Sequence, residues 1–131
     1  MKPYLDTCVV IYLREGPAEQ KARLHERIGA VDSQLAVSDL VRLECLVGPL
    51  RSQNHELVAD YTRFFTQPGL QVTPLTAAVC DQAADLRARY GLKTPDALHA
   101  AAAIAAGCGE FWTNDSRLSV LGPQIRVVVV S

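Results

Sequence analysis

The chain has 131 residues, of which 49% are hydrophobic and 21% charged, so it is long and apolar enough to fold as one domain spanning residues 1–131. That composition excludes a disordered segment, a collagen-like fibre and a charged linker. Thirteen basic residues against 14 acidic ones leave a net charge of −1, which is not the strong positive charge typical of many nucleic-acid-binding proteins.

The first half of the chain alternates short β-rich runs with helical stretches. Strands are predicted at Pro3–Leu5 and Leu35–Val37. Helices are predicted from Thr7 to about Gly16, from Pro17 to about Ile28, from Ser38 to an interruption at Gly48-Pro49, and from Asn54 to Gln67. In the third of these helices, the spacing of Leu40, Leu43 and Val47 predicts the buried stripe.

The second half continues this alternation. Strands are predicted at Leu70–Val72, Phe111–Thr113 and Ile125–Val130, and helices at Thr76–Tyr90 and Thr94–Gly107. The pattern predicts an α/β fold, a three-layer α/β/α sandwich around a mainly parallel central sheet of four to five strands. The valine run of the last strand predicts that both of its faces are covered. The alanines of the last helix predict close packing on the sheet.

Two further features concern the location of the protein. No apolar stretch approaches the ~20 residues of a membrane-spanning helix, and Asp6 lies where a signal peptide would be apolar. The four cysteines are too far apart in sequence to suggest a zinc ribbon or a CxxC redox pair. We therefore expect a cytoplasmic protein with no membrane partner.

Four acids fall near the edge of the predicted sheet at which its parallel strands end. They are Asp6, Glu44, Asp96 and Asp115. Sites in open α/β sheets form at this edge. Asp6 ends the first strand, Asp115 follows the fourth strand by two residues, and Asp96 lies in the first turn of the helix that leads into the fourth strand.

The chemistry of these acids favours a cation site. Glu44 lies within the predicted apolar stripe, where an unpaired carboxylate is costly and a bound cation would remove the cost. Taken singly, each acid has an ordinary explanation, such as a helix dipole, a turn, a salt bridge or a structural strand end. Four carboxylates without His or Cys ligands suit Mg²⁺ or Mn²⁺, and such an ion suits phosphodiester hydrolysis.

Four segments together resemble the PIN-domain ribonucleases, specifically the VapC type found as toxins of prokaryotic toxin–antitoxin pairs. In the family's order, the segments are Tyr4-Leu5-Asp6-Thr7, Ser38-Asp39-Leu40 through Glu44, Thr94-Pro95-Asp96-Ala97-Leu98-His99-Ala100-Ala101, and Thr113-Asn114-Asp115. The resemblance covers essentially the whole chain. It implies a PIN-like fold and an endoribonuclease that uses Mg²⁺ or Mn²⁺ to activate water and cut RNA.

The resemblance also implies roles for individual residues. The catalytic and metal-binding acids would be Asp6, Glu44, Asp96 and Asp115, with Thr7 and Thr113 orienting ligands or the water. Asp39 is the other candidate for the second acid, but its place at a helix start is explained by capping. His99 matches a recurrent family histidine, and it either steadies Asp96 or is a core histidine with a local hydrogen bond.

Partners follow from the same resemblance: an RNA substrate, a cognate antitoxin that inhibits the nuclease, and a second copy in a homodimer. The exposed faces of the helices at 17–28 and 54–67 are candidate antitoxin contacts or plain solvent-facing surfaces. Four basic residues near the site segments are candidate phosphate contacts or ordinary surface charges, namely Arg14, Arg42, Lys93 and Arg117.

Other functions are weighed against this one. A haloacid-dehalogenase-type phosphatase would carry a second Asp two residues after Asp6, where this chain has Cys8. A phospho-receiver domain would carry an acidic pair at the first strand, where Asp6 stands alone. The main alternative is a catalytically silent PIN-like module that binds RNA or a protein without cutting. The presence of all four carboxylates argues against it.

Overall fold

The computed structural model describes residues Met1–Ser131 and has one central sheet of five strands in the order β3-β2-β1-β4-β5. The strands are β1 Pro3–Leu5, β2 Leu35–Ser38, β3 Leu70–Thr73, β4 Glu110–Thr113 and β5 Arg126–Val129. Every neighbouring pair is parallel. Because parallel strands need crossover connections, helices cover the sheet, in agreement with the alternation in the sequence.

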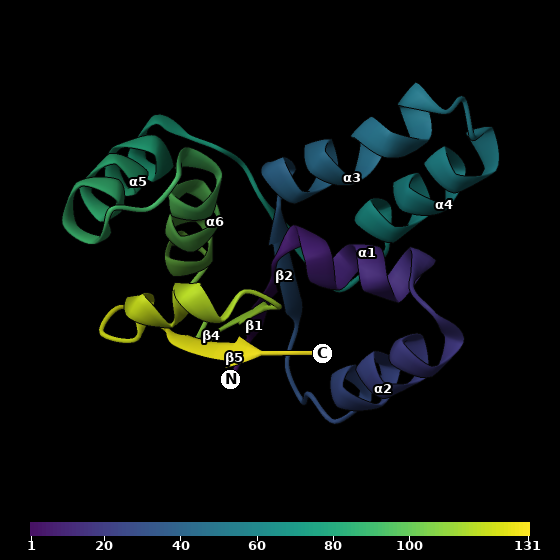
Figure 1. Ribbon diagram of the computed structural model, residues 1–131, viewed down its shortest axis with the longest axis horizontal. Helices are drawn as coiled ribbons and strands as arrows, with labels where there is room; N and C mark the ends of the chain where they lie inside the picture. Colours follow the sequence, from purple (N-terminus) through teal and green to yellow (C-terminus); the bar gives the residue numbers. More distant parts are fainter.

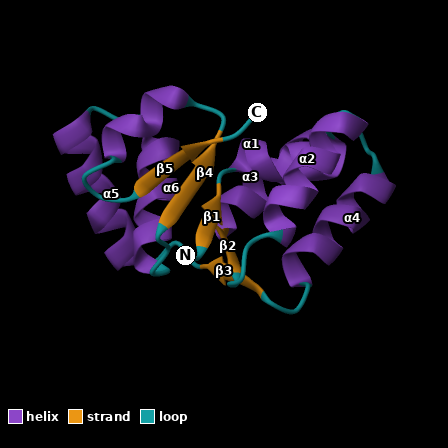
Figure 2. Cartoon of the chain, turned by 90° about the horizontal axis from the view of Figure 1, so that it is seen from below, coloured by secondary structure: helices purple, strands orange, loops and turns teal.

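The connections between strands are mostly helical. The helices are α1 Thr7–Glu15, α2 Ala18–Gly29, α3 Asp39–Arg51, α4 His55–Thr66, α5 Ala77–Tyr90, α6 Thr94–Ala105 and the short 3₁₀ helix η1 Ser116–Leu121. Helices α1 to α4 lie on one side of the sheet, and α5 and α6 lie on the other (Figure 1, Figure 2). The predicted three-layer α/β/α sandwich with a parallel sheet is confirmed.

Helix α6 is buried between the sheet and α5, and its middle turn is entirely alanine. Ala100, Ala101, Ala102 and Ala103 have no exposed surface. These small side chains let the helix backbone approach the strands, as expected from the sequence. Since α6 leads into β4 from the opposite direction, its N-terminus lies at the edge where β1 and β4 end, and this edge carries the site described below.

Helix α3 differs from its prediction in two ways. It continues through Gly48-Pro49 to Arg51, because buried Pro49 packs into the protein and helical hydrogen bonding resumes from Ser52 N to Gly48 O at 3.0 Å. The predicted buried stripe is also wrong. Val41 and Cys45 face the core, whereas Leu43 and Val47 are 58% and 43% exposed. Packing therefore selects a different face of α3 from the one that leucine spacing favours.

Strand β5 also departs from the prediction that both faces are covered. It is an edge strand, and its burial runs from exposed Arg126 through half-buried Val127 and Val128 to Val129, which is 47% exposed. Its valines thus reflect the preference of β-branched residues for strands, not complete burial. Elsewhere in the fold, none of the helices combines the length and the apolar character required to span a membrane.

Candidate functional site

Asp6 is held in place by two adjacent strands, β1 and β4, near the centre of the sheet. It follows β1 directly, and its backbone N donates to Trp112 O of β4 at 2.9 Å. Its Oδ1 accepts from Thr7 N at 2.8 Å, so Asp6, and not Thr7, is the N-cap of α1. Its Oδ2 accepts from Thr113 Oγ1 at 2.8 Å. Both carboxylate oxygens are therefore oriented by their neighbours.

Glu44 lies on α3 and is held from two sides. Thr7 Oγ1 donates to Glu44 Oε1 at 2.7 Å, and His99 Nε2 lies 2.6 Å from the same oxygen. The hydrogen bond from His99 lowers the pKa of the Glu44 carboxyl, with burial opposing it and Thr7 adding to it. Glu44 is therefore held in its ionised form, and its Oε2 is free of these contacts.

A buried polar chain continues behind Glu44. His99 is only 2% exposed, and its Nδ1 lies 2.8 Å from Tyr4 Oη, which lies 2.7 Å from Ser38 Oγ. Burial raises the pKa of Tyr4, so its hydroxyl keeps its proton. The ring is therefore held at both nitrogens, by Tyr4 at Nδ1 and by Glu44 at Nε2. This chain fixes the ring and the carboxylate together.

The position of His99 distinguishes between the two roles considered from the sequence. It is a buried histidine, but its hydrogen-bond partner is Glu44, with Asp6 Oδ1 3.7 Å from Nε2. Of the two alternatives, the core histidine with local hydrogen bonds agrees with the structure, because His99 is bonded to Glu44 and Tyr4 and acts on Asp96 only through its charge. Ser38, at the N-cap of α3, makes no side-chain cap bond, and its Oγ lies 2.7 Å from Tyr4 Oη.

Asp96 has the opposite surroundings. It is half-buried in the first turn of α6, and its pKa is raised by burial first and then by the negative charge of Asp6. Asp115 raises it further, while His99 and Arg117 lower it. No hydrogen-bond donor lowers the pKa of Asp96. This carboxylate is therefore the one acid of the site that has charged neighbours of its own sign and no bonded donor.

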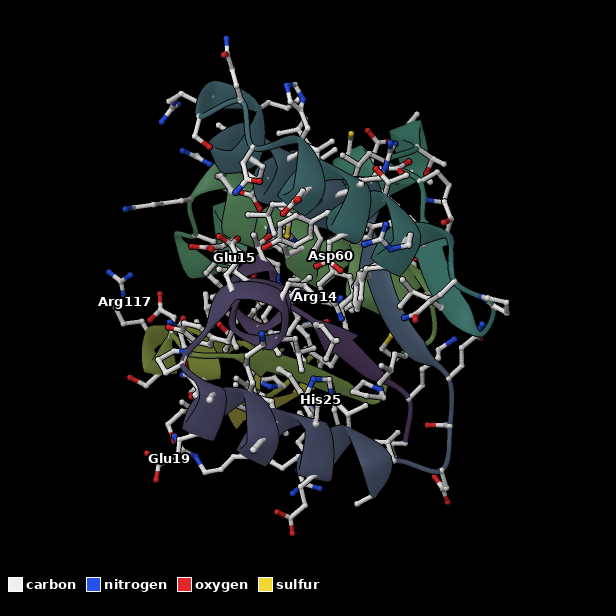
Figure 3. All side chains as sticks on the ribbon, turned by 90° about the vertical axis from the view of Figure 1, so that its right-hand side faces the viewer. Arg14, Glu15, Glu19, His25, Asp60 and Arg117 are labelled. Atoms are coloured by element: carbon white, nitrogen blue, oxygen red, sulfur yellow. The ribbon has the colours of Figure 1, made fainter.

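Asp115 is the N-cap of η1 and is engaged by Arg117. The Arg117 Nη2 donates to Asp115 Oδ2 at 2.7 Å, and the Nε and backbone N of Arg117 donate to Oδ1, each at 3.0 Å. These bonds lower the pKa of Asp115. The Arg117 side chain is 79% exposed and extends away from the body of the protein (Figure 3). An exposed ion pair of this kind contributes little free energy, so another cation can replace Arg117 at Asp115.

A pocket of about 320 Å³ opens beside Asp96 and Asp115. Its other lining residues come from the end of α5, the connection between α5 and α6, and η1, and they are Tyr90, Gly91, Leu92, Lys93, Arg117, Leu118 and Val120. Only Lys93 and Arg117 were singled out from the sequence. The apolar members were missed because a 3₁₀ helix after β4 has no strong pattern and nothing in the sequence places it against α5.

The remaining predicted residues lie away from this pocket. Arg14 of α1 forms a forked ion pair with Asp60 of α4, and the two side chains point toward one another (Figure 3). Arg42 pairs with Asp39 at 3.1 Å on the surface of α3. Both arginines thus have partners within the chain, and Asp39 is occupied at the helix start, which leaves Glu44 as the acid of α3 at the site.

The donor set fits a hard divalent cation in type. Its groups are carboxylate oxygens, and the raised pKa of Asp96 beside Asp6 and Asp115 is the electrostatic environment that a cation relieves. The side chains do not form a closed cage, since no group of three or more His, Cys, Asp or Glu residues is already arranged to hold a metal ion. An ion that keeps several of its own waters is compatible with such an open arrangement.

Comparisons with known proteins agree with this fold. A family model described as "PIN domain" matches residues 4–122. A solved structure of VapBC2 from Rickettsia felis, bound to a DNA fragment from its promoter, is similar with a TM-score of 0.79 and 19% identity, covering 100% of each chain. Mycobacterium tuberculosis VapC20, a sarcin-ricin loop cleaving toxin, has a TM-score of 0.77 and 17% identity, covering 92% of this chain and 95% of that one.

A toxin–antitoxin complex from Klebsiella pneumoniae is also similar, with a TM-score of 0.77 and 20% identity over 98% of this chain and 97% of that one. No curated protein sequence matches this chain. At these identities the structural likeness establishes the fold, and the family match covers most of the sequence.

Proposed function

This chain belongs to the PIN-domain family, and on that premise we propose that it is a metal-dependent endoribonuclease that hydrolyses RNA phosphodiester bonds. The observation that carries the proposal is Asp96, a half-buried carboxylate with no bonded donor that faces the charges of Asp6 and Asp115. Such an arrangement costs free energy unless a cation is shared among the acids. The proposal takes residues 1–131 as one domain.

Four acids are proposed to hold Mg²⁺ or Mn²⁺: Asp6, Glu44, Asp96 and Asp115. When bound, such an ion polarises the phosphate, lowers the pKa of water and neutralises developing charge. Asp6 presents oxygens that are oriented by Thr7 and Thr113. Glu44 presents Oε2, because Oε1 accepts from Thr7 and His99.

The protein's own contribution to hydrolysis is orientation. The hydroxyls of Thr7 and Thr113 keep Glu44 and Asp6 in fixed rotamers, and the buried chain through His99 prevents Glu44 from turning away. An ionised Glu44 can accept a hydrogen bond from the attacking water and align it with phosphorus. No side chain needs to bond covalently to the substrate in this scheme.

We further propose that the protein is the toxin of a toxin–antitoxin pair, inhibited by a cognate antitoxin and acting as a homodimer in the cytoplasm. The support is that similar structures are described as VapBC or toxin–antitoxin complexes. All four cysteines are free, which is typical of a reducing compartment. The exposed faces of α2 and α4 are the proposed antitoxin contacts.

The alternative is a catalytically silent PIN-like module that binds RNA or a protein. Two observations favour it: no group of three or more potential ligands is already arranged to hold a metal ion, and Arg117 already pairs with Asp115. The two candidates differ in their response to metal. A nuclease gains activity with Mn²⁺, whereas a silent module binds its partner without requiring it.

The test is RNA cleavage by the purified, antitoxin-free protein with Mg²⁺ or Mn²⁺ against EDTA. Asp6→Asn and Asp96→Asn are compared with Asp81→Asn, a matched control on the exposed surface of α5. We expect cutting that requires metal, is lost in the first two variants, and persists in Asp81→Asn. Cutting that survives EDTA, or that both site variants retain, would contradict the proposal.

A further inference from the structure

We infer that the pocket lined by Tyr90, Leu92, Lys93, Arg117 and Val120 is a nucleotide-binding subsite. In this inference it holds one unpaired nucleotide of the RNA next to the phosphate that is cut. The inference rests on the proposed function, because it names what the region beside the acids recognises. Its volume of about 320 Å³ is at the lower end of the range of small-ligand sites, which suits a single nucleotide.

Position is the first argument. Asp96 and Asp115 form part of the pocket wall and are also two of the four proposed site acids. A group seated in the pocket is therefore adjacent to the proposed reaction centre. The other described pockets lack this property; one of about 290 Å³ lies between α5 and α6, lined by Cys80, Ala83 and Leu98 among others, and includes none of the four acids.

Charge is the second argument. Lys93 and Arg117 both lie in the pocket wall, and Arg117 Nη2 lies 2.7 Å from Asp115 Oδ2. Lys93 has no ion pair in the structure. Arg117 presents its planar fork to a carboxylate, and the same fork matches a phosphate group. If a cation binds Asp115, the Arg117 guanidinium loses its partner and can bind a phosphate group in the pocket.

The apolar wall is the third argument. Leu92 and Leu118 are buried beneath the pocket, while Val120 is 46% exposed and borders it. Tyr90 is held in place by Gln124 Nε2, which donates to its Oη at 3.1 Å. Apolar and aromatic walls suit the faces of an unstacked base, while cations suit its phosphate. A base within a duplex cannot enter such a pocket, so the ligand is single-stranded.

An acidic or carboxylate-bearing segment of an antitoxin would use the same two cations. The apolar wall beside the acids favours a nucleotide, since a nucleotide presents a flat apolar face and a phosphate together. The two occupants make different predictions for RNA binding, which the experiment below measures. A nucleotide in the pocket makes RNA binding depend on Val120, whereas an antitoxin segment leaves RNA binding unchanged in Val120→Glu.

The experiment is equilibrium binding of a fluorescein-labelled single-stranded oligoribonucleotide, followed by anisotropy at several salt concentrations with Mn²⁺ present. The Asp6→Asn background prevents cutting. The test variants are Lys93→Ala, Arg117→Ala and Val120→Glu. The controls are Arg51→Ala, an exposed arginine of α3, and Val129→Glu, whose valine is 47% exposed on β5 and lies outside the pocket.

We expect each test variant to weaken binding about tenfold, and the two cation variants to reduce the slope of log affinity against log salt by about 0.7 to 1. Both controls should stay within about twofold. Affinity and salt slope equal to the parent in all three test variants would overturn the inference. That result would leave an antitoxin segment as the occupant of the pocket.

Cleavage assays of the same substitutions, made in the protein that retains Asp6, separate this inference from the proposed function. Metal-dependent cutting whose KM rises in Lys93→Ala and Val120→Glu supports both. Cutting with unchanged KM in all pocket variants keeps the nuclease and overturns the subsite. Pocket-dependent RNA binding by a protein that cuts no RNA keeps the subsite and overturns the nuclease.

Discussion

Glu44 and Asp96 are carboxylates of one proposed site, yet the protein surrounds them in opposite ways. Glu44 is backed by a buried chain of hydrogen bonds through His99, Tyr4 and Ser38, and its pKa is lowered. Asp96 faces a pocket, has acids for neighbours, and its pKa is raised. The charge of Glu44 is stabilised by hydrogen bonds within the chain, whereas the charge of Asp96 would be stabilised by a bound cation.

This difference separates two tasks. On the inner side, the polar atoms of Glu44, His99, Tyr4 and Ser38 bond to one another. These bonds fix the position of the Glu44 carboxylate before a ligand binds. The outer side, Asp96 and Asp115 with Arg117, leaves its charge unbalanced or only loosely paired at the surface. A cation and a phosphate would therefore act mainly on the outer side, and substitutions on the two sides should have different signatures.

The largest expected effect comes from breaking the inner side. In His99→Ala, Glu44 and Tyr4 each lose a hydrogen bond to the imidazole. A cavity is also left beside α6, where the ring was. We expect the free energy of unfolding to fall by about 2–4 kcal/mol, by the usual cost of a core cavity and of unpaired buried polar groups. Urea denaturation measures this. A loss below about 0.5 kcal/mol, as for an ordinary surface change, would mean that the chain is not structural.

The comparison also predicts opposite signs in the dependence of stability on pH, without metal. A lowered pKa makes ionised Glu44 stabilising above its ordinary value of 4.5, and this stability is lost as pH falls through the lowered value. A raised pKa makes ionised Asp96 destabilising at neutral pH, and this penalty disappears as pH falls toward 3.8. Each effect should be about 1 kcal/mol or less, because solvent screens both groups.

Denaturation of Glu44→Gln and Asp96→Asn between pH 3 and pH 7 measures these signs, at values chosen to bracket the ordinary carboxyl range. At neutral pH we expect Glu44→Gln to be less stable than the intact chain and Asp96→Asn to be more stable, with both differences shrinking in acid. The same sign for both variants at neutral pH would remove the distinction between the two sides.

The smallest expected effect on stability comes from Arg117→Ala. This side chain is exposed, so its loss should leave the melting temperature unchanged. Mn²⁺ should nevertheless bind more tightly, because Asp115 no longer has to release a guanidinium. Calorimetric titration with Mn²⁺ measures the affinity. Weaker Mn²⁺ binding than in the intact protein would show that Arg117 supports the cation site instead of competing with it.

The sequence predicted the skeleton of this molecule well, because alternation of strands and helices reports on a parallel sheet directly. It also placed Asp6, Asp96 and Asp115 at one edge, since strand ends and helix starts follow from topology. The expectation of a cation at Glu44 rested partly on an apolar stripe that packing does not use, as Leu43 and Val47 are exposed.

What the sequence could not predict depends on contacts between distant side chains. The partner of His99 is 55 residues away in the chain, and no local pattern distinguishes it from Asp96 one turn earlier. The pocket depends on how η1 packs beside the end of α5, which brings Val120 near Tyr90. Both are consequences of tertiary packing, which a periodicity cannot report.

The central claim is that Asp96 belongs to a cation site, and a Mn²⁺ titration of thermal stability tests it most directly. The intact chain and Asp96→Asn are melted at neutral pH with increasing Mn²⁺. A site-bound ion adds about 2.7 kcal/mol at 100 times its Kd, so we predict a rising melting temperature for the intact chain. Asp96→Asn should begin higher without metal and rise little. Equal responses of the two proteins, or no response of the intact chain, would contradict the claim.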